Sequence, residues 1–167
     1  RSTALGRTGG HPEGDVVNYV GTLWGCNYEE FCRLVKGCRA VGVAVHRYGF
    51  VRTRSPRRLS ACSADFSDHG GTRVDGEEVW RLYAASRFFP ALQGGCHLRL
   101  GREYVADRQL DAAASDGMPV VTNNAVVAKA FNLTFAVPED MCTVTAKPAA
   151  ASKNILAQHT YATRLAD

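Results

Sequence analysis

Three residues of this chain, Cys26, His97 and Asp107, are of the types that a thiol nucleophile, its base and an orienting acid require. Asn27 can cap a helix directly after the cysteine, with Glu30 at the capping-box spacing. The partial positive charge of a helix N-terminus favours a thiolate over a thiol. A cysteine nucleophile also needs a base within hydrogen-bond reach and a third group that holds the tautomer of that base. The pattern therefore predicts Cys26 as nucleophile, His97 as base and Asp107 as orienting acid.

The order of these three residues resembles that of compact papain-like cysteine hydrolases, such as the NlpC/P60 peptidases and the leader-type proteases of RNA viruses. In those families a cysteine heads a helix, and a histidine starts a strand that runs through a turn into a second strand. The resemblance covers Trp24–Phe31 and Gly95–Asp107. It implies a peptidase or amidase in which the backbone N–H of Cys26 contributes to an oxyanion hole. Two residues depart from the family pattern: Asn27 replaces an aromatic residue, and Cys96 replaces a glycine.

A non-catalytic role is the competing interpretation. The chain holds six cysteines and five histidines, so a Cys/His pair at a suitable spacing arises easily by chance, and cysteine often packs as a small hydrophobic residue. On this interpretation the chain is a structural or assembly subunit, such as a capsid, coat or accessory component of a large complex. Its terminal segments and basic loop would then contact protein partners or further copies of the chain. The sequence does not decide whether the protein is an enzyme.

Much of the positive charge lies in one short run. The chain has a net charge of +4, and the run contains Arg52, Arg54, Arg57 and Arg58. Such a loop could contact nucleic acid or an acidic partner. No aromatic residue interleaves with these arginines, so a solvated loop without a binding role stays open as the alternative.

The cysteine spacing argues against a metal centre. The sequence contains no C-x-x-C, so neither a zinc ribbon nor a thioredoxin-like pair is indicated. His69 with Asp65 and Asp68 could bind a metal, but the spacing matches no known ligand set. We expect no metal and no cofactor, and we expect the cysteines to be free thiols in a reducing, cytoplasmic compartment.

Two further motifs carry less weight. The sequon Asn132-Leu133-Thr134 has apolar, strand-like surroundings, which together with free thiols favour an accidental occurrence. The glycine pairs of the chain are followed by neither a Walker motif nor a G-x-G-x-x-G helix start. Nucleotide binding is therefore not indicated by these motifs.

Hydrophobic periodicity and capping residues along the chain predict a mixture of helices and strands. Helices are expected over 12–23, 26–36, 75–89, 111–116, 124–131 and 148–165, and strands over 40–51, 119–122, 96–107 and 133–146, the last two as hairpins. Gly37 is expected to end the second helix as its C′ residue. We predict an α+β fold, with helices at the N-terminal side and on both flanks of a small, mainly antiparallel sheet.

Length and composition indicate one domain. A chain of 167 residues with 46% hydrophobic residues can bury one core. Residues 1–11 are small, polar and glycine-rich, so we expect a flexible arm followed by a single globular domain over 12–167. That domain is expected to carry a long basic loop at 52–74. No apolar run is long enough to cross a bilayer, and no membrane contact is expected.

Overall fold

The computed structural model describes residues 15–25, 27–52, 62–71, 74–95, 98 and 119–145. The strands are β1 (Val16–Val20), β2 (Leu23–Trp24), β3 (Ala44–Gly49), β4 (Val51–Arg52), β5 (Ser67–Gly70), β6 (Phe89–Ala91), β7 (Val120–Thr122) and β8 (Thr134–Phe135). The helices are α1 (Tyr28–Ala40), α3 (Gly76–Ala84), α6 (Ala125–Phe131) and the 3₁₀ turn η1 (Pro138–Asp140). The predicted mixture of helices and strands is confirmed. In these segments no helix is long and apolar enough to span a bilayer.

Every strand pair that the structure describes is parallel. One sheet has the order β1-β3-β5 and another the order β6-β7-β8. Strands β2 and β4 continue β1 and β3 in the same register, because Val20 pairs with Tyr48 and Leu23 pairs with Val51. The strand predicted over 40–51 is therefore present as β3 and its continuation β4, whereas residue 40 still belongs to α1 and residues 41–43 connect the helix to the strand.

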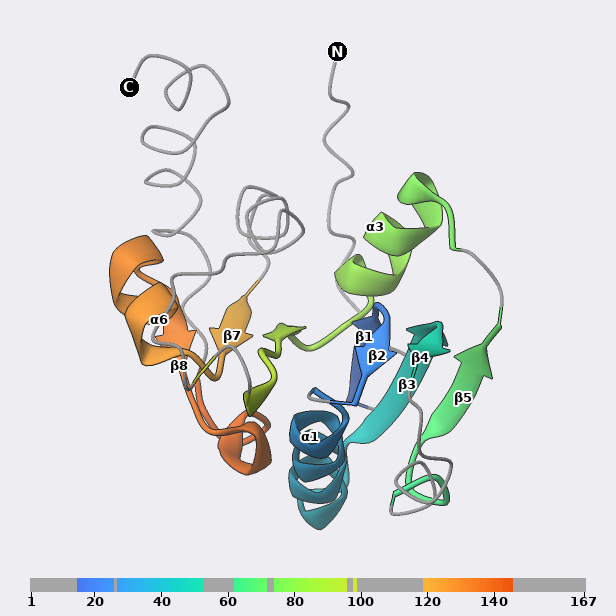
Figure 1. Ribbon diagram of the computed structural model, residues 1–167, viewed down its shortest axis with the longest axis horizontal. Helices are drawn as coiled ribbons and strands as arrows, with labels where there is room; N and C mark the ends of the chain where they lie inside the picture. Colours follow the sequence, from blue (N-terminus) through green and yellow to red (C-terminus); the bar gives the residue numbers. More distant parts are fainter. Residues whose placement is uncertain are drawn as a thin grey trace.

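The two three-stranded sheets meet between β1 and β6. The Arg87 amide donates to the Val16 carbonyl over 2.8 Å, and the Asn18 amide donates to Ser86 Oγ over 3.0 Å. The chain thus enters β6 beside the first residue of β1, and β6 then contacts β1. This arrangement indicates that the two strands run in the same direction. Figure 1 shows β6, in lime green, between β7 and β1. Placed side by side at this junction, the two sheets give the order β5-β3-β1-β6-β7-β8, which is that of a doubly wound α/β sheet.

This topology corrects the predicted antiparallel sheet. The segment 133–146 does not form a hairpin, because β8 pairs with β7 in parallel and is followed by η1. A local sequence pattern predicts strands but does not choose their partners, and here the partners come from distant segments. The hairpin predicted over 96–107 lies outside the described residues apart from residue 98.

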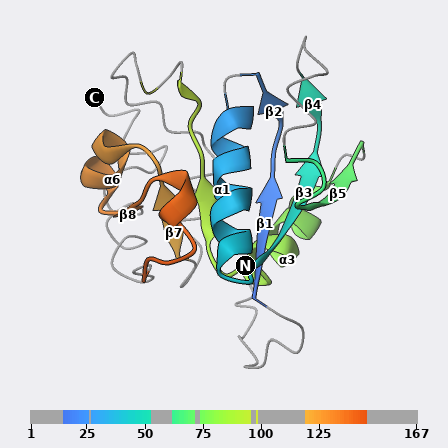
Figure 2. The same ribbon diagram turned by 90° about the horizontal axis from the view of Figure 1, so that it is seen from below.

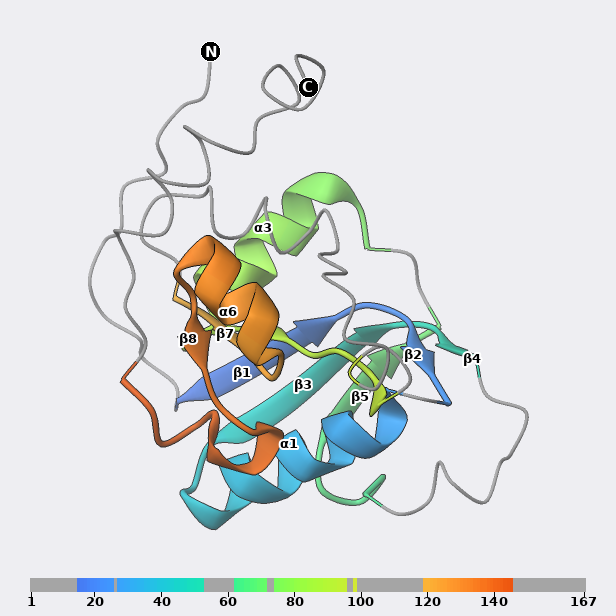
Figure 3. The same cartoon turned by 60° about the vertical axis from the view of Figure 1, so that its left-hand side comes forward.

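Helices cover both faces of the sheet. Figure 2 shows α1 in front of the sheet and α3 behind it. The alternation of β1 matches these two layers, because Val17 and Tyr19 pack in the core on the α1 side, whereas Val20 packs in the core that contains Tyr83 of α3. That second core also includes Val127 and Phe131 of α6, which lies over β7 and β8 in Figure 3.

Residues 16–20 form a strand, so the helix predicted over 12–23 is wrong. The sequence VVNYV is rich in β-branched and aromatic residues, which favour strands. Buried positions occur on both faces of this central strand, and its hydrophobic residues therefore show no simple alternation. The spacing of Val16, Tyr19 and Leu23 then matches a helix by coincidence.

Gly37 lies inside α1 and does not end it. A Cβ at this position would come within 2.0 Å of the Glu139 carbonyl oxygen, so the glycine allows α1 to pack directly on the backbone of η1. The helix ends three residues later, at Ala40. The glycine is needed because α1 and η1 lie so close together. The sequence alone does not distinguish such a glycine from one that caps a helix.

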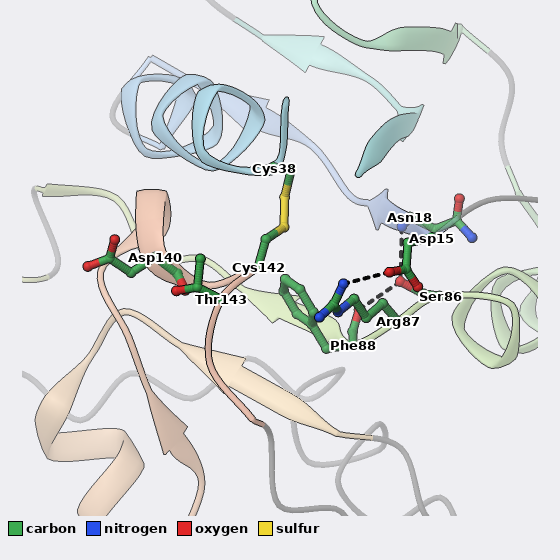
Figure 4. The surroundings of a disulfide bond; sticks show 9 residues. All are labelled: Asp15, Asn18, Cys38, Ser86, Arg87, Phe88, Asp140, Cys142 and Thr143. Atoms are coloured by element: carbon green, nitrogen blue, oxygen red, sulfur yellow. Dashed lines mark hydrogen bonds and ion pairs between the residues drawn. A yellow bond between two sulfur atoms is a disulfide. The ribbon is translucent and has the colours of Figure 1, made fainter. Parts of the chain in front are cut away.

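Two disulfides attach α1 to the rest of the chain. Cys32 is bonded to Cys62, and Cys38 is bonded to Cys142 across 104 residues. Figure 4 shows the second bond bridging α1 and the segment after η1. The prediction of free thiols is wrong for these four cysteines, because residues far apart in sequence are brought together by the sheet.

Candidate ligand-binding edge

The order of the strands reverses between β1 and β6. Strands added after β1 in the chain extend the sheet towards β5, whereas β6 starts the opposite half. In open parallel α/β sheets, ligands bind outside the carboxyl ends of the strands at such a switch point. The described residues that reach this edge are 21–25 and 27 after β1 and 92–95 after β6. They define the candidate site.

The turn before α1 is organised by Asn27. Its Oδ1 accepts the Trp24 amide over 2.6 Å, and its Nδ2 donates to the Thr22 carbonyl over 3.4 Å. Asn27 is the N-cap residue, as predicted, but its side chain makes no hydrogen bond to the first turn. Its amide group is used to shape the connection from the sheet to the helix. The polar side chain thus fixes the backbone of this edge of the molecule.

An exposed tryptophan and an arginine lie side by side at the same edge. Trp24 and Arg52 are partners in the β2–β4 ladder, and the guanidinium carbon of Arg52 lies 5.5 Å from the centroid of the Trp24 ring. Leu23 is fully buried in the α1-side core, so alternation turns Trp24 to the other face, where 49% of it is exposed. A cation and a large aromatic surface are thereby presented together to solvent.

The ends of β6 and β7 are joined by buried amide groups. The Gln93 amide donates to Asn123 Oδ1 over 2.8 Å, and Asn123 Nδ2 donates back to the Gln93 carbonyl over 2.9 Å. Asn124 Nδ2 donates to Gln93 Oε1 over 2.6 Å, while its Oδ1 accepts two amides at the start of α6. Each of the three side chains is more than nine-tenths buried. The network fixes residues 92–95 beside the switch point.

A buried arginine fills the space between β3, β5 and α1. Arg47 forms an ion pair with Asp68 and donates to the Gly49 carbonyl over 3.0 Å. Only 4% of its side chain is exposed, and its Nε has no hydrogen-bond partner among the described residues. Burial raises the pKa of the nearby Tyr28 hydroxyl, an effect that Arg47 opposes and Asp68 reinforces. This cluster is held inside the fold by its own ion pair.

Two histidines face each other on the opposite side of β3 and β5. The ring centroids of His46 and His69 are 5.1 Å apart, and Tyr48 stacks on His69 at 4.8 Å. Burial lowers the pKa of His46, and the neighbouring His69 lowers it further. Burial also raises the pKa of Tyr48, with a smaller contribution from Glu78. The neutral form of His46 is therefore the one that the fold favours.

The structure does not test the predicted catalytic residues. Cys26, His97 and Asp107 lie outside the described residues, and their placement stays a prediction. Of the four arginines of the basic run only Arg52 is described; Arg54, Arg57 and Arg58 are not.

The two aspartates suggested as metal ligands form ion pairs with arginines. Asp65 pairs with Arg39, and Asp68 pairs with Arg47. Within the described segments, no group of three or more His, Cys, Asp or Glu side chains could hold a metal ion.

No protein-family model matches the chain, and no curated protein matches it. Among solved structures, the chain is similar to AviGT4, a glycosyltransferase involved in Avilamycin A biosynthesis, with a TM-score of 0.58 and 15% identity. The match covers 92% of this chain and 48% of AviGT4, so this chain spans about half the length of that protein. The lipopolysaccharide outer core galactosyltransferase WaaB matches with a TM-score of 0.44 and 15% identity over 87% of this chain and 39% of WaaB.

These findings correct the resemblance to papain-like cysteine hydrolases. The fold, with its parallel strands, is similar to that of about half of AviGT4, and not to that of a cysteine peptidase. Helix α1, with Asn27 as its N-cap residue, follows the first strands of a doubly wound sheet, so a helix start at this position does not by itself indicate a cysteine peptidase. The predicted functions of hydrolase and of viral or structural subunit gain no support from the structural neighbours.

Sequence reasoning missed the amide network and Trp24. Asn124 is predicted as a helix start, but its bond to Gln93 joins residues that are 31 positions apart and leaves no local signal. Trp24 lies in the stretch that the sequence singles out, next to Cys26. Its role at the edge becomes visible only once β2 is paired with β4.

Proposed function

We propose that this chain forms a ligand-binding α/β domain of a glycosyltransferase, and that an activated sugar binds at the carboxyl edge of its sheet. The observation that carries the proposal is the parallel strand order with its switch point between β1 and β6, in a fold similar to that of AviGT4 over most of this chain. The chain has no G-x-G-x-x-G turn. The proposal therefore depends on the side chains at this edge.

Trp24 and Arg52 are suited to the two parts of such a ligand. The flat, exposed face of Trp24 offers an apolar surface on which a sugar ring or a base can stack. The guanidinium of Arg52 can bind phosphate oxygens of the leaving group through charge-assisted hydrogen bonds. This keeps Arg52 as a contact for an anionic ligand, and extends the same proposal to Arg54, Arg57 and Arg58.

Because the chain spans about half of AviGT4, the test is a binding experiment and not an activity assay. The sequence has two tryptophans, so Trp80→Phe leaves Trp24 as the single indole fluorophore. We expect saturable quenching of Trp24 when this variant is titrated with uridine, guanosine or thymidine diphosphate sugars. The matched variant Trp24→Phe retains Trp80, on α3, and should show little change.

Arginine variants test the anionic part of the ligand. Arg52→Ala should weaken binding about tenfold or more, since a hydrogen bond to a charged group contributes about 1.5 to 3 kcal/mol. Arg81→Ala, on the exposed side of α3, is the control and should bind as the parent does. Equal quenching of both tryptophans, or no response to any of the sugars, would contradict the proposal.

A further inference from the structure

The chain carries one N-glycosylation sequon, Asn132-Leu133-Thr134, at the junction of α6 and β8. Asn132 is the C-cap residue of α6 and adopts the left-handed conformation, with φ 51° and ψ 41°. It is exposed, whereas Phe131 before it is buried in the core. Phe131 and Leu133 pack in the second core, whereas Phe135 after the sequon is exposed and the asparagine itself lies on a surface turn.

The disulfides provide an independent observation. Cys32–Cys62 and Cys38–Cys142 are both formed. Disulfides of this kind persist in oxidising compartments, including the lumen of the endoplasmic reticulum, where asparagine sequons are also modified. Free thiols and apolar, strand-like surroundings were the two reasons to regard the sequon as accidental. Four of the six cysteines are disulfide-bonded, and the asparagine lies on an exposed turn before β8.

We propose that Asn132 is an N-glycosylation site and that the chain is made in the secretory pathway. The co-reactant is an oligosaccharide linked to a lipid pyrophosphate. The amide nitrogen of Asn132 attacks the anomeric carbon, the new C–N bond replaces the C–O bond to the pyrophosphate, and the amide loses one proton as the lipid pyrophosphate leaves. The hydroxyl of Thr134 is the second part of the recognised sequon.

The folded domain can accommodate a glycan here without blocking the candidate ligand-binding edge. Helix α6 begins just after the carboxyl end of β7 and ends at Asn132, just before the amino end of β8. Asn132 therefore lies at the opposite edge of the sheet from Trp24 and residues 92–95. The proposal is independent of the glycosyltransferase assignment.

The experiment is secretion of the full chain from cultured eukaryotic cells behind a cleavable signal peptide. Peptide-N-glycosidase should shift the mass of the secreted protein, and it should leave an aspartate at position 132 that peptide mass spectrometry detects. Asn132→Gly should abolish the shift while tolerating the left-handed backbone. Thr134→Ala should also abolish it, whereas Thr134→Ser keeps a hydroxyl and should retain it.

Two results would overturn the proposal. One is a secreted, disulfide-bonded chain in which Asn132 is unmodified. The other is a mass shift that persists in both Asn132→Gly and Thr134→Ala. Peptide mapping of both disulfides in each secreted variant establishes that a missing glycan does not result from misfolding.

Discussion

The two halves of the sheet are stabilised in different ways. The half formed by β1, β3 and β5 is covered by α1, and both disulfides are attached to that helix. The half formed by β6, β7 and β8 is joined at its carboxyl ends by the buried amides of Gln93, Asn123 and Asn124. The Cys32–Cys62 bond fixes α1 to the segment before β5, and the Cys38–Cys142 bond fixes it to the segment after η1, which follows β8. The loops after β6 and β7 are fixed by hydrogen bonds instead. The comparison predicts that reduction of the disulfides loosens α1, whereas loss of the side-chain amides loosens the loops after β6 and β7.

The largest effect is expected from the long disulfide. Replacing both partners, Cys38→Ser with Cys142→Ser, should lower the free energy of unfolding by about 4 to 5 kcal/mol, because the bond closes a loop of about 100 residues in the unfolded chain. Removing Cys32 and Cys62 in the same way should cost about 3 to 4 kcal/mol, since that loop is shorter. Denaturant unfolding measures both losses. A long-disulfide variant as stable as the parent would remove the stabilising role of this bond.

The amide network should give the next largest effect, confined to the second half. Asn124→Ala removes the cap of α6 and the donor to Gln93 Oε1, which together should cost about 2 to 4 kcal/mol. Asn27→Ala is the matched control, because Asn27 is also an N-cap residue but makes no side-chain bond to its helix. It should cost about 1 kcal/mol or less. Equal losses in the two variants would contradict the assigned difference between the halves.

The close packing of α1 on η1 gives a steric test. Gly37→Ala brings a Cβ against the Glu139 backbone and should destabilise the protein by about 1 to 3 kcal/mol. The control is Gly76→Ala, at the start of α3, where no atom lies within 4 Å of the added Cβ. That variant should be neutral or slightly stabilising. Thermal unfolding of the two variants provides the measurement, and a neutral Gly37→Ala would show that α1 and η1 separate freely.

The smallest effect is a pH dependence of the first half. The folded state lowers the pKa of His46, so its stabilising contribution is complete above the unfolded value of about 6.5 and is lost as the pH falls towards the folded pKa. The groups that face it include His69, with Tyr48 and Glu78 close by. His46→Gln should flatten the fall in melting temperature below about pH 6.5. An unchanged slope would assign that fall to other groups.

Local signals in the sequence predict several elements well. The helix predicted from residue 75 is present as α3, and Asp75 is its N-cap residue, whose side chain accepts the Glu78 amide over 2.9 Å. The helix ends at Ala84 and not at Phe89, which instead starts β6. Asn124 begins α6, which ends at Phe131 as predicted, and β7 lies within the predicted strand over 119–122. Caps and short periodic runs depend on neighbouring residues, so they can be predicted from the sequence alone.

The predictions that were wrong concern features that depend on contacts between distant parts of the chain. The strand order, the disulfides and the close packing of Gly37 each join segments that are far apart in the chain. The candidate ligand-binding edge has the same origin, since Trp24 meets Arg52 and Gln93 meets Asn124 only through strand pairing. A single sequence does not specify these partners, and a cysteine at a helix start therefore suggested another fold.

The central claim is that the ligand binds at the carboxyl edge of the sheet. Amide chemical shifts of the labelled full chain, titrated with the diphosphate sugar that quenches Trp24 most strongly, test it directly. The account predicts shift changes concentrated at residues 21–25, 92–95 and 123–124, which follow β1, β6 and β7. Changes concentrated at the amino ends of the strands, at residues 41–43, 87–88 and 132–133, would contradict it.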